Sequence, residues 1–243
     1  MAPPRKLATA AGACFLVTHV TSIGALVLYG PVLGGADYVT GPGPDARVLL
    51  GALFEVLLAL AIVGTAVALL PVVRRYGESA AAGYVALRTL EAAVIAVGIV
   101  SLLAVVTLRQ EGAPGREVET LRVVGRALVA VHDWTFLVGP NFVLGANTVL
   151  LASLLYRSRL VPRFIAVLGL VGGPLIFGSA VAVLFGAYAQ VSTWGSLAAV
   201  PVFAWELALA FRLIVAGFRP PAGADVGGSD AGGSREVVGV RAG

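Results

Sequence analysis

The sequence predicts an all-α membrane protein, a single bundle of six transmembrane helices, several of them kinked by proline. Hydrophobic residues make up 58% of its 243 residues and charged residues only 12%, against about 25% charged in soluble globular proteins. The apolar residues gather in six stretches of roughly twenty or more, each long enough to cross ~30 Å of hydrocarbon. We expect spans at residues 7–30, 48–70, 83–108, 127–155, 160–187 and 193–217, together a domain over 7–218.

The first span begins directly after Arg5 and Lys6, as a secretory signal would. Its apolar run continues to about Tyr29, which is longer than the apolar core of a typical signal, so we interpret it as a retained helix after a cytoplasmic tail over residues 1–6. Cys14, the one cysteine, lies within this span and allows neither a disulfide within the chain nor a cysteine-based metal site.

Turn-forming and charged residues separate the later spans. Gly41–Pro44 reads Gly-Pro-Gly-Pro and cannot continue a helix, so a loop is expected there. Arg109–Arg126 mixes both signs of charge and is expected to be a second loop, with a short surface helix. Prolines inside the fourth, fifth and sixth spans are expected to kink those helices: Pro140, Pro174 and Pro201.

The distribution of basic residues predicts the orientation. Ten lie on the side of the two chain ends and five on the other side. Because basic loops stay in the cytoplasm, we expect both termini there. Residues 219–243 are rich in Pro, Gly, Ala, Ser and Asp without apolar periodicity, and predict a disordered cytoplasmic tail. The net charge of +4 sits at the ends of apolar spans, which indicates headgroup contact and no nucleic-acid partner.

Small residues in the fifth span indicate close helix packing. Gly169 and Gly173 form a G-x-x-x-G pattern, which brings helices together either within one chain or across a homodimer.

Placing an ionisable residue near the bilayer centre costs about 2.5–3.5 kcal/mol of insertion free energy, so such residues usually have a structural or functional role. Arg88 and Glu91 are three residues apart in the third span and are expected to form an ion pair within that helix. Such a pair also serves to hold the helix against its neighbours.

A second group lies at one depth on the second and fourth spans. Glu55 and the adjacent pair His132 and Asp133 are each about 10 Å from the same side of the membrane. His132 and Asp133 point ~100° apart, and we expect Asp133 to meet Glu55, with Asn147 extending the Asp133 face inward. The group reads either as a proton relay, with carboxyls sharing a proton, or as a hydrogen-bonded cluster that holds the bundle together.

Two further ionisable residues are expected near mid-membrane. Glu206 follows Pro201 in the sixth span, and His19 lies in the first. Two histidines on different helices, here His19 and His132, could hold a haem, which would make the protein a membrane redox protein. Otherwise no cofactor and no metal are expected.

Signatures of the common enzyme classes are missing from the sequence: it has no G-x-S-x-G, H-E-x-x-H, P-loop or C-x-x-C. We therefore name no catalytic residue and favour a protein that is not an enzyme.

Four segments resemble a known family: Leu70–Arg75 (LPVVRR), Gly83–Arg88 with Glu91, Trp134 with Gly139 and Pro140, and Leu155–Arg163 (LYRSRLVPR). Over most of residues 7–218 the chain resembles the bacterial membrane proteins of domain-of-unknown-function family 4386. The resemblance implies a multi-pass bacterial integral membrane protein, and we expect it in the cytoplasmic membrane. It implies no activity and no site residues.

Arg157, Arg159 and Arg163 crowd the short turn before the fifth span. The cluster could bind the headgroup of an anionic phospholipid, or it could only fix the topology.

Three hypotheses about function follow. The first is a transporter-like bundle for a proton or a small solute, using Glu55, Asp133 and Glu206 with His132 and His19. The second is a non-catalytic membrane scaffold or sensor component in which the polar residues serve packing. The third is the haem protein described above.

Overall fold

The computed structural model describes residues 4–34, 38–41, 43–111 and 118–219. In this part of the chain every regular element is helical, and six helical segments are long and apolar enough to cross a membrane. The prediction of an all-α bundle of six spans is confirmed. The six segments are Arg5–Leu28, Asp45–Tyr76, Glu78–Gln110, Val118–Ser158, Arg163–Leu184 and Thr193–Val215.

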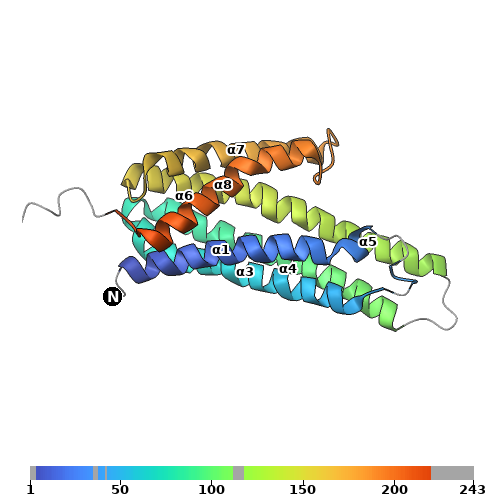
Figure 1. The fold of residues 1–243 in the computed structure, drawn as a ribbon. Helices are drawn as coiled ribbons and strands as arrows, with labels where there is room; N and C mark the ends of the chain where they lie inside the picture. The colour runs from blue at the N-terminus through green and yellow to red at the C-terminus, as the bar shows by residue number, and fades with distance from the viewer. Residues whose placement is uncertain (1–3, 35–37, 42, 112–117, 220–243) are drawn as a thin grey trace, which may run out of the picture.

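The long helices lie side by side along one axis (Figure 1). In chain order the elements are α1 (Pro4–Leu28), the short α2 (Gly30–Gly34), α3 (Asp45–Val73), the 3₁₀ turn η1 (Arg74–Tyr76), α4 (Glu78–Gln110), α5 (Val118–Leu137), the π-helical segment η2 (Val138–Val143), α6 (Leu144–Ser158), α7 (Arg163–Leu184) and α8 (Thr193–Val215). We name each end of the bundle after the first residue of a helix that begins there. The Pro4 face is the end at which α1 begins and α8 ends, and the Asp45 face is the end at which α3 and α8 begin.

Several helix boundaries differ from the sequence prediction by a few residues, and the largest difference is at the start of the fourth span. The third span continues to Gln110 and the fourth begins at Val118, well before residue 127. The fourth span is longer because its first turns pack on the neighbouring loop: a Cβ on the buried Gly125 would lie 3.3 Å from the side chain of Val39. Of the expected loop 109–126, residues 112–117 lie outside the described residues, as do residues 220–243 of the expected tail.

The six spans form a closed ring. α1 packs on α3, α3 on α4, α4 on the continuous unit α5–η2–α6, α6 on α7, α7 on α8, and α8 again on α1. Because the last contact closes the ring, the space at its centre is bounded by all six spans.

Two apolar clusters fill the bundle, one toward each face. The cluster toward the Pro4 face includes Phe15, Tyr84 and Trp205. The cluster toward the Asp45 face includes Tyr29 and Leu102. Between them on the inner side of the ring lie buried ionisable residues, which form the site described below.

Close backbone contacts hold α6, α7 and α8 together. A Cβ on Gly173 would lie 2.8 Å from the carbonyl oxygen of Gly145, and a Cβ on Gly169 would lie 2.5 Å from Nε1 of Trp205. Both glycines of the G-x-x-x-G pattern therefore make close packing contacts with other helices of the same chain. A homodimer stays a prediction.

Candidate functional site

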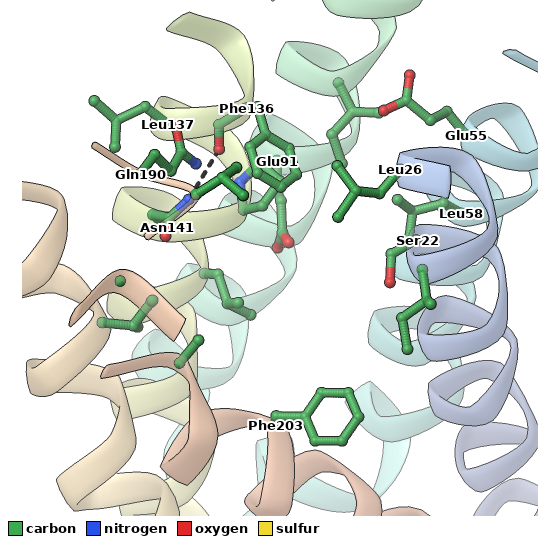
Figure 2. A pocket seen from close by; sticks show the side chains of 18 of the residues that line it. Ser22, Leu26, Glu55, Leu58, Glu91, Phe136, Leu137, Asn141, Gln190 and Phe203 are labelled. Atoms are coloured by element: carbon green, nitrogen blue, oxygen red, sulfur yellow. Dashed lines mark hydrogen bonds between the residues drawn. The ribbon is translucent and has the colours of Figure 1, made fainter. Parts of the chain in front are cut away.

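A cavity of about 710 Å³ lies inside the ring. Figure 2 shows Ser22 and Leu26 of α1 facing Leu137 and Gln190 across it, with Glu91 of α4 between them. The cavity also has ionisable side chains from five of the six spans in its wall. They are His19, Glu55, Arg88, Glu91, His132, Asp133 and Glu206.

Arg88 lies at the inner end of this cavity and is 1% exposed. Its Nη1 is 3.2 Å from Oε2 of Glu91 on the same helix, as the spacing in the sequence indicates. Its Nη2 donates to Oε1 of Glu206 on α8 at 2.8 Å. One guanidinium thus faces two buried carboxylates, and the interaction ties α4 to α8.

The third nitrogen of Arg88 is also engaged. Its Nε donates to the hydroxyl of Tyr84 at 3.3 Å, and that hydroxyl lies 3.3 Å from Oγ1 of Thr65 on α3. The guanidinium carbon lies 5.4 Å from the ring centre of Phe15 on α1. Four helices therefore meet at Arg88, and each of its nitrogen atoms has a partner.

Asn147 joins this network, because its Nδ2 donates to Oε2 of Glu91 at 2.7 Å. The sequence had placed Asn147 on the Asp133 face, and that expectation is wrong. The reason is η2, which lies between the two positions. A π-helical turn takes up about one extra residue, so every later side chain is turned back by ~100° relative to a continuous α-helix. This rotation carries Asn147 off the Asp133 face and toward α4.

Glu55 has two partners outside its own helix, Tyr29 in the turn after α1 and His132 on α5. The hydroxyl of Tyr29 donates to its Oε2 at 2.9 Å, and Nε2 of His132 lies 3.6 Å from its Oε1. The expectation that Asp133 would meet Glu55 is also wrong. Only one of two adjacent side chains can face α3, and it is His132, which is 5% exposed. The Asp133 side chain is 64% exposed and lies 3.6 Å from Nδ1 of His132.

His19 and Glu206 form the other cross-helix pair. Nδ1 of His19 lies 2.8 Å from the carbonyl oxygen of Phe15, and its Nε2 points to Oε2 of Glu206 at 3.8 Å. Each histidine of the cavity thus stands beside a carboxylate of another helix. The haem alternative stays a prediction.

Two polar atoms in the cavity wall lack a hydrogen-bond partner among the described residues. They are Nδ1 of His132 and Nε2 of Gln190, and both are buried. Buried polar groups are normally satisfied, so a bound molecule or water is the natural partner for them.

At the Asp45 face a polar cluster fastens the loop before α3 to the end of α4. The hydroxyl of Tyr38 donates to Asp45 at 2.8 Å, and Arg109 pairs with the same carboxylate and donates to the carbonyl of Gly41 at 3.0 Å. Burial, together with the hydrogen bond to Asp45, raises the pKa of Tyr38. Sequence reasoning missed this cluster, because it treated Arg109 only as a charge in a loop.

The basic turn at the Pro4 face is open to its surroundings. Arg157, Arg159 and Arg163 are exposed, and the guanidinium of Arg163 lies 5.5 Å from the ring centre of Tyr156. Arg159 ends α6 in the left-handed conformation, with φ of 56°. The residues are placed so that a headgroup can reach them, and lipid binding stays a prediction.

Comparison with protein families gives a match over nearly all of the described chain. The sequence profile of the family described as "Domain of unknown function (DUF4386)" matches residues 10–217. Comparisons with curated proteins and with solved structures gave no match.

Proposed function

Because the chain belongs to the DUF4386 family, whose description states no activity, we propose a function from the cavity itself. The protein is a multi-pass membrane carrier that binds a small solute in this cavity and couples its movement to protons. The observation that carries the proposal is the gathering of ionisable side chains from five spans around one cavity inside the membrane.

The charges of the cavity favour proton coupling. Among the described residues, its wall contains three buried carboxylates (Glu55, Glu91 and Glu206) and the exposed Asp133, but one arginine, Arg88. Unpaired charge is costly in a low-dielectric interior, so the excess negative charge is stabilised by protons or by a bound cation. His19 and His132 stand next to these carboxylates, and an imidazole can accept or donate a proton there.

The cavity is closed on one side. It extends to Gln190 and Val191 near the Asp45 face and ends at Arg88 and Glu206. Beyond these residues the apolar cluster around Trp205 fills the bundle toward the Pro4 face. A carrier also needs a second state, open at the Pro4 face. Pro201 in α8 and the π-helical η2 are points at which the regular helical bonding is already interrupted, and a helix can bend there.

We assign the Pro4 face to the cytoplasm of a bacterial cell. Arg5 and the exposed Arg74, Arg75 and Arg157 lie at that face, and basic residues mark the cytoplasmic side of a membrane protein.

Two cysteine substitutions test the carrier. In a Cys14→Ser background, Ser22→Cys reports on the cavity, and Ala81→Cys reports on the closed side, since Ala81 is fully buried and lies ~10 Å from Arg88 toward the Pro4 face. A membrane-impermeant thiol reagent is applied to intact cells and to inverted vesicles. We expect Ser22→Cys to react from the outside and Ala81→Cys to react, more slowly, from the inside.

The second candidate is a sensor or scaffold component, favoured by the way in which Arg88 joins four helices. For such a protein Ser22→Cys reacts from the outside while Ala81→Cys reacts from neither side, and that result would rule out the carrier.

A further inference from the structure

We propose that the solute is a lipophilic organic cation that enters the cavity from the membrane, between α1 and α8. This inference rests on the proposed carrier and names its substrate class. It is argued from the charge of the cavity, its aromatic wall and the chemistry of its rim.

The charges select a cation. An anion would need a free positive group, but the guanidinium of Arg88 is fully engaged with Glu91, Glu206 and Tyr84. The two histidines of the wall each stand beside a carboxylate of another helix. In contrast, carboxylate oxygens in the wall remain available to bind a cation. Glu206 uses Oε1 for Arg88, and its Oε2 is 3.8 Å from His19, too far for a hydrogen bond. The carboxylate of Asp133 is mostly exposed and also lines the cavity.

The aromatic side chains of the wall suit an organic cation better than a metal ion. Tyr29, Phe136, Phe203 and Trp134 all line the cavity, and the ring of Phe203 packs against His19 with centres 4.6 Å apart. Aromatic faces attract organic cations, and more strongly where water is excluded. A volume of about 710 Å³ lies in the range of small-molecule sites, ~300–1,000 Å³.

The position of α8 creates an entrance beside α1. The two helices are in contact toward the Pro4 face, where a Cβ on Gly12 would lie 2.7 Å from the carbonyl oxygen of Ala210. Their contact continues through the rings of Phe15 and Trp205 and then through those of His19 and Phe203. From there α8 leans away from α1, so that the two helices diverge toward the Asp45 face (Figure 1).

The side chains at this divergence are apolar and exposed. Ile23 and Leu26 of α1 are 52% and 45% exposed, Phe203 of α8 is 42% exposed, and all three line the cavity. An entrance for water-soluble molecules would be polar, whereas these side chains are compatible with lipid. A molecule that enters here therefore comes from the membrane, with its charge reaching Glu206 and its apolar part among Leu26, Leu58 and neighbouring side chains.

Binding of two matched ions tests the substrate class. Tetraphenylphosphonium and tetraphenylborate carry the same four phenyl groups and opposite charges, and each is titrated into the protein in phosphatidylcholine nanodiscs, with empty discs as the blank. We expect saturable binding of tetraphenylphosphonium only. Glu206→Gln should weaken it at least about tenfold, since a charged partner is lost. Asp133→Asn should weaken it several-fold, and because its side chain is exposed this variant will fold even if Glu206→Gln does not.

The control is Glu78→Gln, which removes an exposed carboxylate outside the cavity and should leave binding unchanged. Saturable binding of tetraphenylborate, phosphonium binding no greater than that of empty discs, or full binding by Asp133→Asn and any folded Glu206→Gln would each overturn the proposed cation.

The route of entry is tested by two substitutions on α1. Ile23→Trp fills the entrance and should slow association of tetraphenylphosphonium, whereas Val27→Trp, at an exposed position outside the cavity wall, should not. Equal association rates would overturn entry between α1 and α8.

The outcomes separate this inference from the proposed carrier. Thiol labelling of Ala81→Cys without phosphonium binding would keep the carrier and remove the cation. Phosphonium binding without that labelling would keep the cation site and remove the carrier.

Discussion

Arg88 and Glu206, 118 positions apart in the chain, lie 2.8 Å from each other inside the bundle, and both side chains are buried. The pair joins the third and sixth spans, α4 and α8, directly, although α5, α6 and α7 lie between them in the chain. It is therefore the point at which the stability of the bundle and the charge of the cavity depend on the same atoms.

Arg88→Gln is expected to destabilise the protein strongly. The substitution leaves Glu91 and Glu206 buried without their cation, and breaking a buried ion pair by removing one partner costs about 3–5 kcal/mol. Thermal unfolding in detergent measures the loss, and Arg88→Lys should recover part of it. Arg75→Gln, at an exposed arginine, is the control and should shift stability by less than about 0.5 kcal/mol. An Arg88→Gln variant as stable as the control would show that the pair contributes nothing.

Gly173→Ala and Gly178→Ala form a matched pair on α7. The new methyl group at Gly173 would lie 2.8 Å from the backbone oxygen of Gly145, whereas no heavy atom of the described residues lies within 4 Å of one at Gly178. We expect Gly173→Ala to cost about 1–3 kcal/mol through overpacking. Gly178→Ala should be neutral or stabilise by up to about 1 kcal/mol, because alanine favours a helix. Thermal unfolding of both variants checks the prediction, and a reversed order would contradict the packing of α6 against α7.

Asn147→Leu is expected to destabilise by about 1–3 kcal/mol, because it removes a hydrogen bond to a buried carboxylate. Ser153→Ala on the same helix is the control, since among the described residues the Ser153 hydroxyl bonds only to the carbonyl of Val149 one turn away. Equal unfolding temperatures for the two variants would mean that Glu91 does not depend on Asn147.

The raised pKa of Tyr38, at the Asp45 face, predicts that the stability of the protein depends on pH. Because the pKa of this tyrosine is raised in the folded protein, the folded state holds the phenolic proton to higher pH than the unfolded chain does. The contribution of Tyr38 to stability is therefore complete below the ordinary tyrosine pKa and is lost as the pH rises toward the raised value. Between about pH 8 and about pH 11 the wild-type protein should lose more stability than Tyr38→Phe. Parallel thermal unfolding curves for the two proteins would contradict this.

The basic turn predicts lipid retention. If Arg157, Arg159 and Arg163 hold an anionic headgroup, Arg157→Gln with Arg159→Gln should reduce the anionic phospholipid that stays bound in native mass spectrometry several-fold. Arg74→Gln with Arg75→Gln removes the same charge from another exposed site at the Pro4 face and is the control. Equal losses in both double variants would leave the turn with a role in topology alone.

The six spans and their order were predictable from the sequence, because length and apolar composition suffice to identify a membrane helix. The spacing of Arg88 and Glu91 also indicated their pairing, since it is local to one helix. The pairing of Arg88 with Glu206 was not predictable, because the sequence does not state which helices become neighbours in the ring.

The partners of Asn147 and His132 show a second limit. Pro140 predicts an irregularity in the fourth span, but the sequence does not state that it takes the form of the π-helical η2. The rotation that η2 introduces decides which side chains of α6 face α4. Similarly, His132 and Asp133 are adjacent and both polar, so only the packed structure determines which of them turns to Glu55.

The contacts of Arg5 have a consequence for biogenesis. Its guanidinium donates to the carbonyl oxygens of Ile214 and Val215, at the end of α8, with distances of 2.8 Å and 3.0 Å. A ribosome makes α1 first among these spans and α8 last, so the ring stays open throughout insertion of the intervening helices. During that time Arg88 has Glu91 within its own helix but not yet Glu206. A nascent chain arrested before α8 would therefore expose its polar centre to lipid, where unpaired charge is costly.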